Sequence, residues 1–142
     1  MNSMKNLLLY LWQLPQNLAG LIVLLVNHNN WTCHATFTPS ENGKMLITPE
    51  YFMVDHLADA GVSLGKYIIF DSCCIVRPID YEHEKGHQKQ SLYLGWLYLI
   101  VIGIPSGIHN LISRKNKCSY YHFWNEAWAD KLGGVKRHTN DK

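Results

Sequence analysis

The 142-residue sequence lacks the features of several protein classes. Its formal net charge is only +2, from 13 basic and 11 acidic residues, so it offers no broad basic surface and we predict no nucleic-acid partner. No internal repeat or low-complexity tract is present, and the length favours one main domain. The basic residues of the C-terminal part are interpreted as loop and tail charges: Arg114, Lys115, Lys117, Lys136 and Arg137.

A disulfide framework is also absent. Two of the four cysteines, Cys73 and Cys74, are adjacent, and adjacent cysteines rarely bridge each other without backbone strain. No Cys-x-x-Cys pair occurs. We interpret the cysteines as free or buried thiols of a reducing compartment, with a bridge between Cys33 and Cys118 as the open alternative.

The N-terminus is apolar but has no small-x-small site of a cleaved signal peptide. The 20 residues from Leu7 to Val26 could span a bilayer as one helix, although polar residues around Pro15 interrupt the run. Two short helices at a membrane surface, or one helix packed on the domain, are the alternatives. We predict that residues 1–27 form an apolar helical segment and candidate membrane anchor, and that residues 28–142 form the main domain.

The middle of the sequence predicts a small antiparallel β-meander, because β-branched and aromatic runs alternate with turn residues. The expected strands are Thr32–Phe37, Lys44–Val54, Val62–Phe70 with Gly65 inside it, and Cys73–Val76. Pro78 ends the last of them.

Helices are predicted after the meander, which gives an α+β fold class. The first starts with Asp80 as its N-cap, continues through the apolar residues 92–102 and ends at Gly103-Ile104-Pro105-Ser106. A second covers 106–113, and a last one runs from Ser119 to Leu132 before Gly133-Gly134.

The first helix carries His83-Glu84-Lys85-Gly86-His87, which has the pattern H-E-x-x-H. Histidines four residues apart lie on one helix face, so both imidazoles can reach one metal ion. Glu84 is offset around the helix and can address a water molecule at that ion. Gly86 costs about 1 kcal/mol of helix stability relative to alanine, which indicates close packing against that face.

A third ligand is expected because catalytic zinc sites use three protein ligands. Glu126 on the last helix is the candidate. Asp130 follows four residues later on the same face and can accept a hydrogen bond from the second ring nitrogen of a ligand histidine. This arrangement also requires the apolar stretch to reverse direction, which we expect at Gly103-Ile104-Pro105.

H-E-x-x-H followed by Asn-Glu-x-x-x-Asp on a later helix resembles the gluzincins, the thermolysin-like clan of zinc metallopeptidases. The resemblance implies that His83, His87 and Glu126 bind Zn²⁺ and that Glu84 is the general base. It also implies that Asp130 and Asn125 support the ligands from behind.

The chain also resembles small bacterial proteins of uncertain function with a His-Glu-x-Gly-His helix and a Trp-Ala-Asp-x-Leu-Gly-Gly end. Candidate transition-state donors are Tyr120, Tyr121 and His122, for which aromatic packing of a helix start is the alternative.

We therefore expect a minimal zincin-like metallopeptidase with a peptide or protein substrate, associated with a bacterial membrane. A cytoplasmic soluble protein is the alternative location. The alternative function is a non-enzymatic, membrane-associated module that binds zinc structurally or binds a partner. In one version of it, Cys73, Cys74 or Cys118 joins the histidines as ligands.

Overall fold

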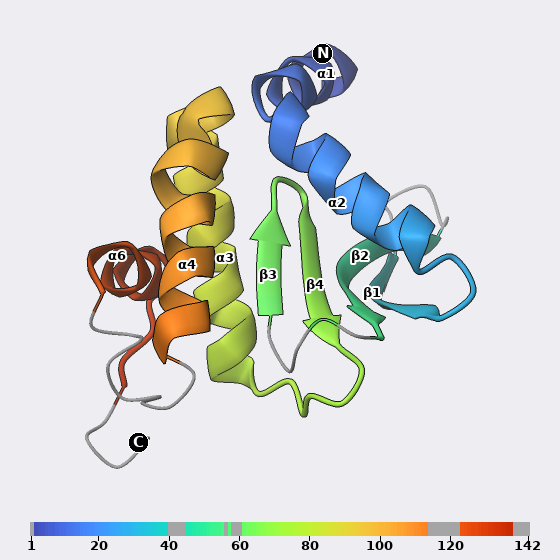
Figure 1. The fold of residues 1–142 in the computed structure, drawn as a ribbon. Coiled ribbons are helices and arrows are strands. Elements are labelled where there is room, and N and C mark those ends of the chain that lie inside the picture. Colours follow the sequence, from blue (N-terminus) through green and yellow to red (C-terminus); the bar gives the residue numbers. More distant parts are fainter. Residues whose placement is uncertain (1, 40–44, 56, 58–60, 114–122, 138–142) are drawn as a thin grey trace.

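The middle of the chain forms a four-stranded sheet, and helices from both ends of the chain pack beside it (Figure 1). The structure is a computed structural model that describes residues 2–39, 45–55, 57, 61–113 and 123–137. The predicted α+β class is confirmed. The helices and strands, in chain order, are α1 (Asn2–Trp12), α2 (Leu14–Val26), β1 (Trp31–Pro39), β2 (Met45–Val54), β3 (Gly61–Leu64), β4 (Tyr67–Asp71), α3 (Pro78–Leu94), α4 (Ile104–Ser113) and α6 (Trp124–Gly133).

The sheet is mixed, with the strand order β1-β2-β4-β3. β1 pairs with β2 and β3 with β4 in antiparallel fashion, whereas β2 and β4 run parallel. The predicted antiparallel meander is therefore wrong in strand order and in one pairing. The physical reason is Gly65, whose positive φ of 64° closes a tight hairpin and divides the expected strand Val62–Phe70 into β3 and β4. Cys73–Val76 forms no strand and connects β4 to α3.

Helix α2 covers the sheet and completes a small apolar core. Leu24 from α2 packs with Val54 from β2 and Ile69 from β4. Gly20 lets α2 approach the β3–β4 hairpin, because a Cβ at this position would press on the Tyr67 ring. β3, one of the two edge strands of the sheet, contacts both α2 and α3 (Figure 1).

The start of α3 is fixed by a charged cap. Arg77 is the N-cap, Pro78 occupies the first turn, and the Asp80 carboxylate accepts hydrogen bonds from the Arg77 backbone N–H at 3.2 Å and from its guanidinium at 2.9 Å. Asp80 is therefore the third helical residue and not the predicted N-cap. Burial raises the pKa of Asp80, but the hydrogen bonds from Arg77 outweigh burial and the pKa is lowered.

The apolar chain after α3 reverses earlier than predicted. α3 ends at Leu94, Gly95 adopts a positive φ of 52°, and a 3₁₀ turn at Gly95–Leu97 leads into π-helical residues Leu99–Gly103. The expected end at Gly103–Ser106 is wrong because Pro105 falls in the first turn of α4, where proline is tolerated. The last helix starts at Trp124, after the extended Phe123, and it ends at Gly133, one residue after the predicted Leu132, with Gly134 left-handed. The predicted start at Ser119 lies outside the described residues.

No single helix of the described residues is long and apolar enough to cross a membrane. Two bent pairs reach that length and composition together. α1 and α2 meet at 85°, and residues Pro78–Leu97 meet Leu99–Ile112 at 117°.

Replacing Asp80 with alanine should lower the free energy of unfolding by about 1 kcal/mol, because the Arg77 cap loses its acceptor. Since the folded-state pKa of Asp80 is lowered, its contribution is present above the ordinary value of 3.8 and is lost as the pH falls below it. Urea denaturation of wild type and variant at several pH values measures this. Glu82→Ala is the control: Glu82 forms an exposed ion pair with Lys85, and its loss should lower the free energy of unfolding by less. An equal loss in both variants would contradict the role of Asp80 in the helix cap.

Candidate metal centre

The centre lies where α3 and α6 pack against each other at close range. A Cβ on Gly86 of α3 would overlap the carbonyl oxygen of Ala129, and a Cβ on Gly133 of α6 would overlap that of Glu82. Both glycines therefore allow backbone-to-backbone contact. The close packing predicted from Gly86 is confirmed, and its partner is the helix that carries Glu126.

His83, His87 and Glu126 converge on one point. The Nε2 atoms of His83 and His87 lie 3.1 Å and 3.2 Å from the same oxygen, Oε2 of Glu126. The ligand atoms of the three side chains lie within 4.8 Å of one another, and all three residues are buried. The group of residues expected from the sequence is thus assembled, and it could hold a metal ion.

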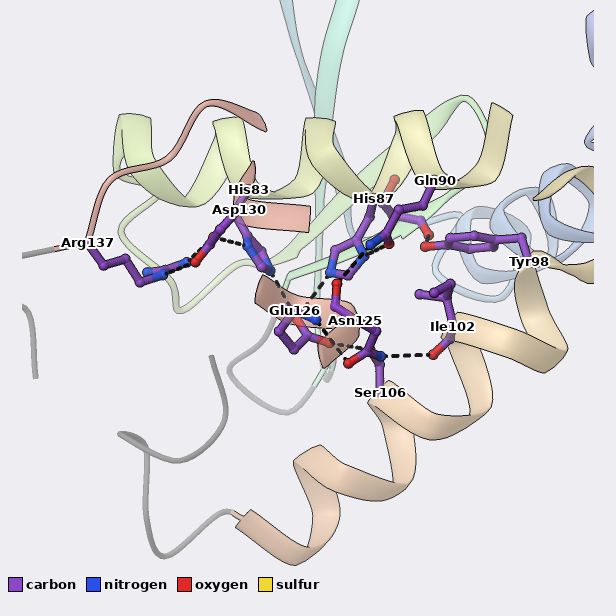
Figure 2. A network of polar contacts seen from close by, with 11 residues as sticks. His83, His87, Gln90, Tyr98, Ile102, Ser106, Asn125, Glu126, Asp130 and Arg137 are labelled. Carbon is purple, nitrogen blue, oxygen red and sulfur yellow. Dashed lines mark hydrogen bonds and ion pairs between the residues drawn. The ribbon is translucent and has the colours of Figure 1, made fainter. Parts of the chain in front are cut away.

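The other ring nitrogen of each histidine contacts an acceptor (Figure 2). His83 Nδ1 lies 2.6 Å from the Asp130 carboxylate, and His87 Nδ1 lies 2.8 Å from the side-chain oxygen of Gln90. These acceptors favour the tautomer with the proton on Nδ1, which leaves the Nε2 lone pairs directed at Glu126.

Such an arrangement needs a cation. Two imidazole lone pairs and a carboxylate oxygen are all acceptors, and three buried acceptors at 3.1–3.2 Å repel one another unless protons or a metal ion lie between them. Two nitrogens and one oxygen from three residues form a donor set that transition metals accept. The residues present therefore fit a metal ion.

The electrostatics of these side chains show the same requirement for positive charge. Burial lowers the pKa of His83, but its contacts with Asp130 and Glu126 outweigh burial and raise the pKa to about 9. Burial raises the pKa of Glu126, yet the hydrogen bonds from the two histidines hold it well below its usual range. Without a metal, protons on the histidines would thus supply the positive charge that Glu126 demands.

Further side chains fix Glu126 and Asp130 (Figure 2). The Ser106 hydroxyl on α4 donates to the second oxygen of Glu126 and accepts from the Asn125 side chain at 2.6 Å. Arg137 donates to both oxygens of Asp130, at 2.8 Å and 3.1 Å. Asp130 thus contacts His83, and Asn125 reaches Glu126 through Ser106.

Glu84 is buried beside this cluster with one oxygen unused. Among the described residues, its Oε2 has no hydrogen-bond partner. Its other oxygen lies near the backbone of β3, since a Cβ on Gly61 would be 2.9 Å from it. Burial raises the pKa of Glu84, although the nearby histidines lower it in part. A carboxylate with a raised pKa is a stronger base than a carboxylate exposed to water.

Three residues that hydrogen-bond to His87, Glu126 or Asp130 are not predicted from the sequence. Gln90 is three residues after His87, and this i,i+3 spacing is the signal that could have found it. Ser106 was interpreted as a turn residue and Arg137 as a tail charge, and no local pattern marks either one. The candidate donors Tyr120, Tyr121 and His122, and also Cys118, lie outside the described residues.

Comparisons with protein families, with curated proteins and with solved structures found no match to this chain. The site is therefore interpreted from its own geometry.

Gly86→Ala should separate α3 from α6 and destabilise the protein by about 1–3 kcal/mol or more, because the added methyl overlaps a backbone carbonyl. Gly107→Ala is the matched control: a Cβ there meets nothing within 4 Å, and alanine favours the helix. Urea denaturation with metal analysis of both variants tests this. Equal stability of the two would contradict the close contact.

Wild-type protein should bind one divalent transition-metal ion, and Glu126→Ala should weaken binding at least about 100-fold, because the variant removes one of three ligands. The measurements are elemental analysis and titration with a competing chelator. The control is Glu82→Ala, an exposed carboxylate on α3. Unchanged affinity in Glu126→Ala would rule out this metal site.

Proposed function

We propose that this protein is a zinc-dependent metallopeptidase. The observation that carries the proposal is the buried Glu84 carboxyl group, which has an unused oxygen beside the convergent His83, His87 and Glu126. A structural site has no use for such a carboxyl group, whereas a hydrolase requires one as a base.

Zinc is the proposed metal because it binds two imidazoles and a carboxylate and keeps a fourth position open in catalytic sites. Closed structural sites favour four ligands and often include cysteine. In the described part of the chain, the group with metal-binding geometry contains neither Cys73 nor Cys74. The donor set therefore favours the catalytic type.

The chain's own residues have distinct parts in the proposed hydrolysis. When bound, zinc supplies Lewis acidity, which polarises a carbonyl group and acidifies water. Glu84 takes the proton of the attacking water and passes it to the leaving amine. Asp130 and Gln90 keep the two histidines in the tautomer that binds metal.

The peptide substrate is proposed to lie along the edge strand β3. In the described sheet β3 pairs only with β4, and its Gly61 end lies beside Glu84. The Tyr98 hydroxyl donates to the Ser63 carbonyl at 3.0 Å and holds the strand in place. An extended peptide can add to such an edge through backbone hydrogen bonds.

A pocket next to this edge would receive a substrate side chain. It has a volume of about 260 Å³ and lies between β3, the β4–α3 connection and the start of α3. Gly61, Phe70 and His83 are in its lining, so it reaches one residue of the candidate metal-binding group.

Glu84→Gln should keep the metal but lower peptide hydrolysis by at least about 100-fold, because an amide cannot take the proton. Zinc content and cleavage of a library of unstructured fluorogenic peptides are measured together. Glu82→Gln, on the exposed surface of the same helix, is the control and should retain activity.

Hydrolysis by Glu84→Gln at the wild-type rate would exclude this mechanism. Zinc binding by the wild type with no cleavage in the library would instead support a non-enzymatic metal-binding module.

A further inference from the structure

The N-terminal helices and the α3–α4 turn have inverted polarity. On α2, the buried residues include Gln16 and Asn17, both 0% exposed, while Leu25 is 60% exposed and Val26 76% exposed. At the end of α3, Gln90 and Ser91 are buried, whereas the following turn exposes Trp96, Leu97 and Ile100. Water favours the opposite distribution, with polar groups outside and large apolar groups inside.

Exposed apolar side chains also point in several directions. Leu7, Leu8 and Leu9 of α1 follow one another at about 100° around the helix axis, and all three are exposed. A flat protein partner covers one stripe of a helix, but a fluid apolar medium covers every direction. A helix that is apolar around its circumference is typical of a buried or membrane environment.

The two helix breaks in this region satisfy each other's backbone groups. The indole N–H of Trp12, at the end of α1, donates to the Leu92 carbonyl at 2.8 Å. The indole N–H of Trp96 donates to the Leu11 carbonyl at 2.9 Å, and Gln16 donates to the Gly95 carbonyl at 2.9 Å. Carbonyls freed by a helix break must be paired inside the protein wherever water is absent.

Basic residues border the starts of both segments. Residues 6–26 and 91–113 contain no Asp, Glu, Lys or Arg; Lys5 precedes the first segment and Lys89 the second, whereas the first charged residue after the first segment is Glu41. Lys66, in the β3–β4 turn, lies over the Tyr10 ring of α1 at 4.8 Å. Basic residues beside apolar helices attract anionic lipid headgroups.

We infer that α1, the exposed side of α2 and the turn between α3 and α4 insert into the apolar layer of a bilayer with anionic headgroups, without crossing it. The bend of 117° turns the chain after α3 back toward the side from which it came, and the bend of 85° sets α1 nearly perpendicular to α2, so neither pair forms a straight span. This inference is independent of the proposed hydrolysis.

Sedimentation with lipid vesicles tests the inference on the full-length protein. Vesicles of phosphatidylcholine alone are compared with equimolar phosphatidylcholine and phosphatidylglycerol, at low and high salt. We expect stronger binding to the anionic vesicles and a decrease of that difference with salt.

Leu8→Glu and Ile100→Glu, at positions 60% and 63% exposed, should each weaken binding at least about tenfold, because a carboxylate is costly in the apolar layer. Ile75→Glu is the matched control: Ile75 is 89% exposed but lies in the β4–α3 connection, outside the inserted segments. It should bind like wild type. Circular dichroism of each variant checks folding.

Three results would overturn the inference. The first is a wild type that sediments with neither kind of vesicle, and the second is an equal loss of vesicle binding in all three variants. The third result is a dimer, seen by light scattering, that Leu8→Glu and Ile100→Glu dissociate in a protein that binds no vesicles. The last result would assign the surface to a second copy of the chain.

Discussion

The contact between α3 and α6 is the constraint on which the rest of the structure depends. Glu126 is separated from His87 by 39 positions, and only a backbone-to-backbone approach at Gly86 and Gly133 brings its carboxylate to within 3.2 Å of both histidines. Larger residues at these positions would hold the helices apart. The group of residues that could bind a metal therefore depends on helix packing as much as on the motif. Glycine allows this packing because it has no side chain.

Polar side chains inside the protein connect this site to the N-terminal helices. Gln90 binds His87 and the Asn125 carbonyl, and its neighbour Ser91 accepts hydrogen bonds from Gln13 and Gln16. Two consecutive residues of α3 thus join the candidate metal site on one side to the α1–α2 junction and α2 on the other. Each buried amide here is costly to leave unpaired, so these bonds fix the helices in one arrangement.

The sequence predicts local features well, but it does not predict which distant segments the chain brings together after a turn. The spacing of His83 and His87, the close packing at Gly86 and the helix stop at Gly133-Gly134 follow from short-range geometry, and the structure has all three. The hairpin at Gly65 was missed because a glycine inside a β-rich run fits either a strand or a turn. Ser106 could not be found, since its hydrogen bond to Glu126 depends on where the chain returns and not on any nearby residue.

The early reversal at Gly95 explains how an apolar surface and a polar candidate metal site occur in one small fold. A straight helix through residues 92–112 would carry the chain about 30 Å away from His87. Instead, the Trp12 ring occupies the space that a side chain at position 95 would need, and Gln16 binds the carbonyl at the break. The chain then returns with Ser106 in reach of Glu126. The N-terminal helices therefore stabilise a turn that exposes apolar residues at one end of the hairpin. The same turn brings Ser106 to the candidate metal site at the other end.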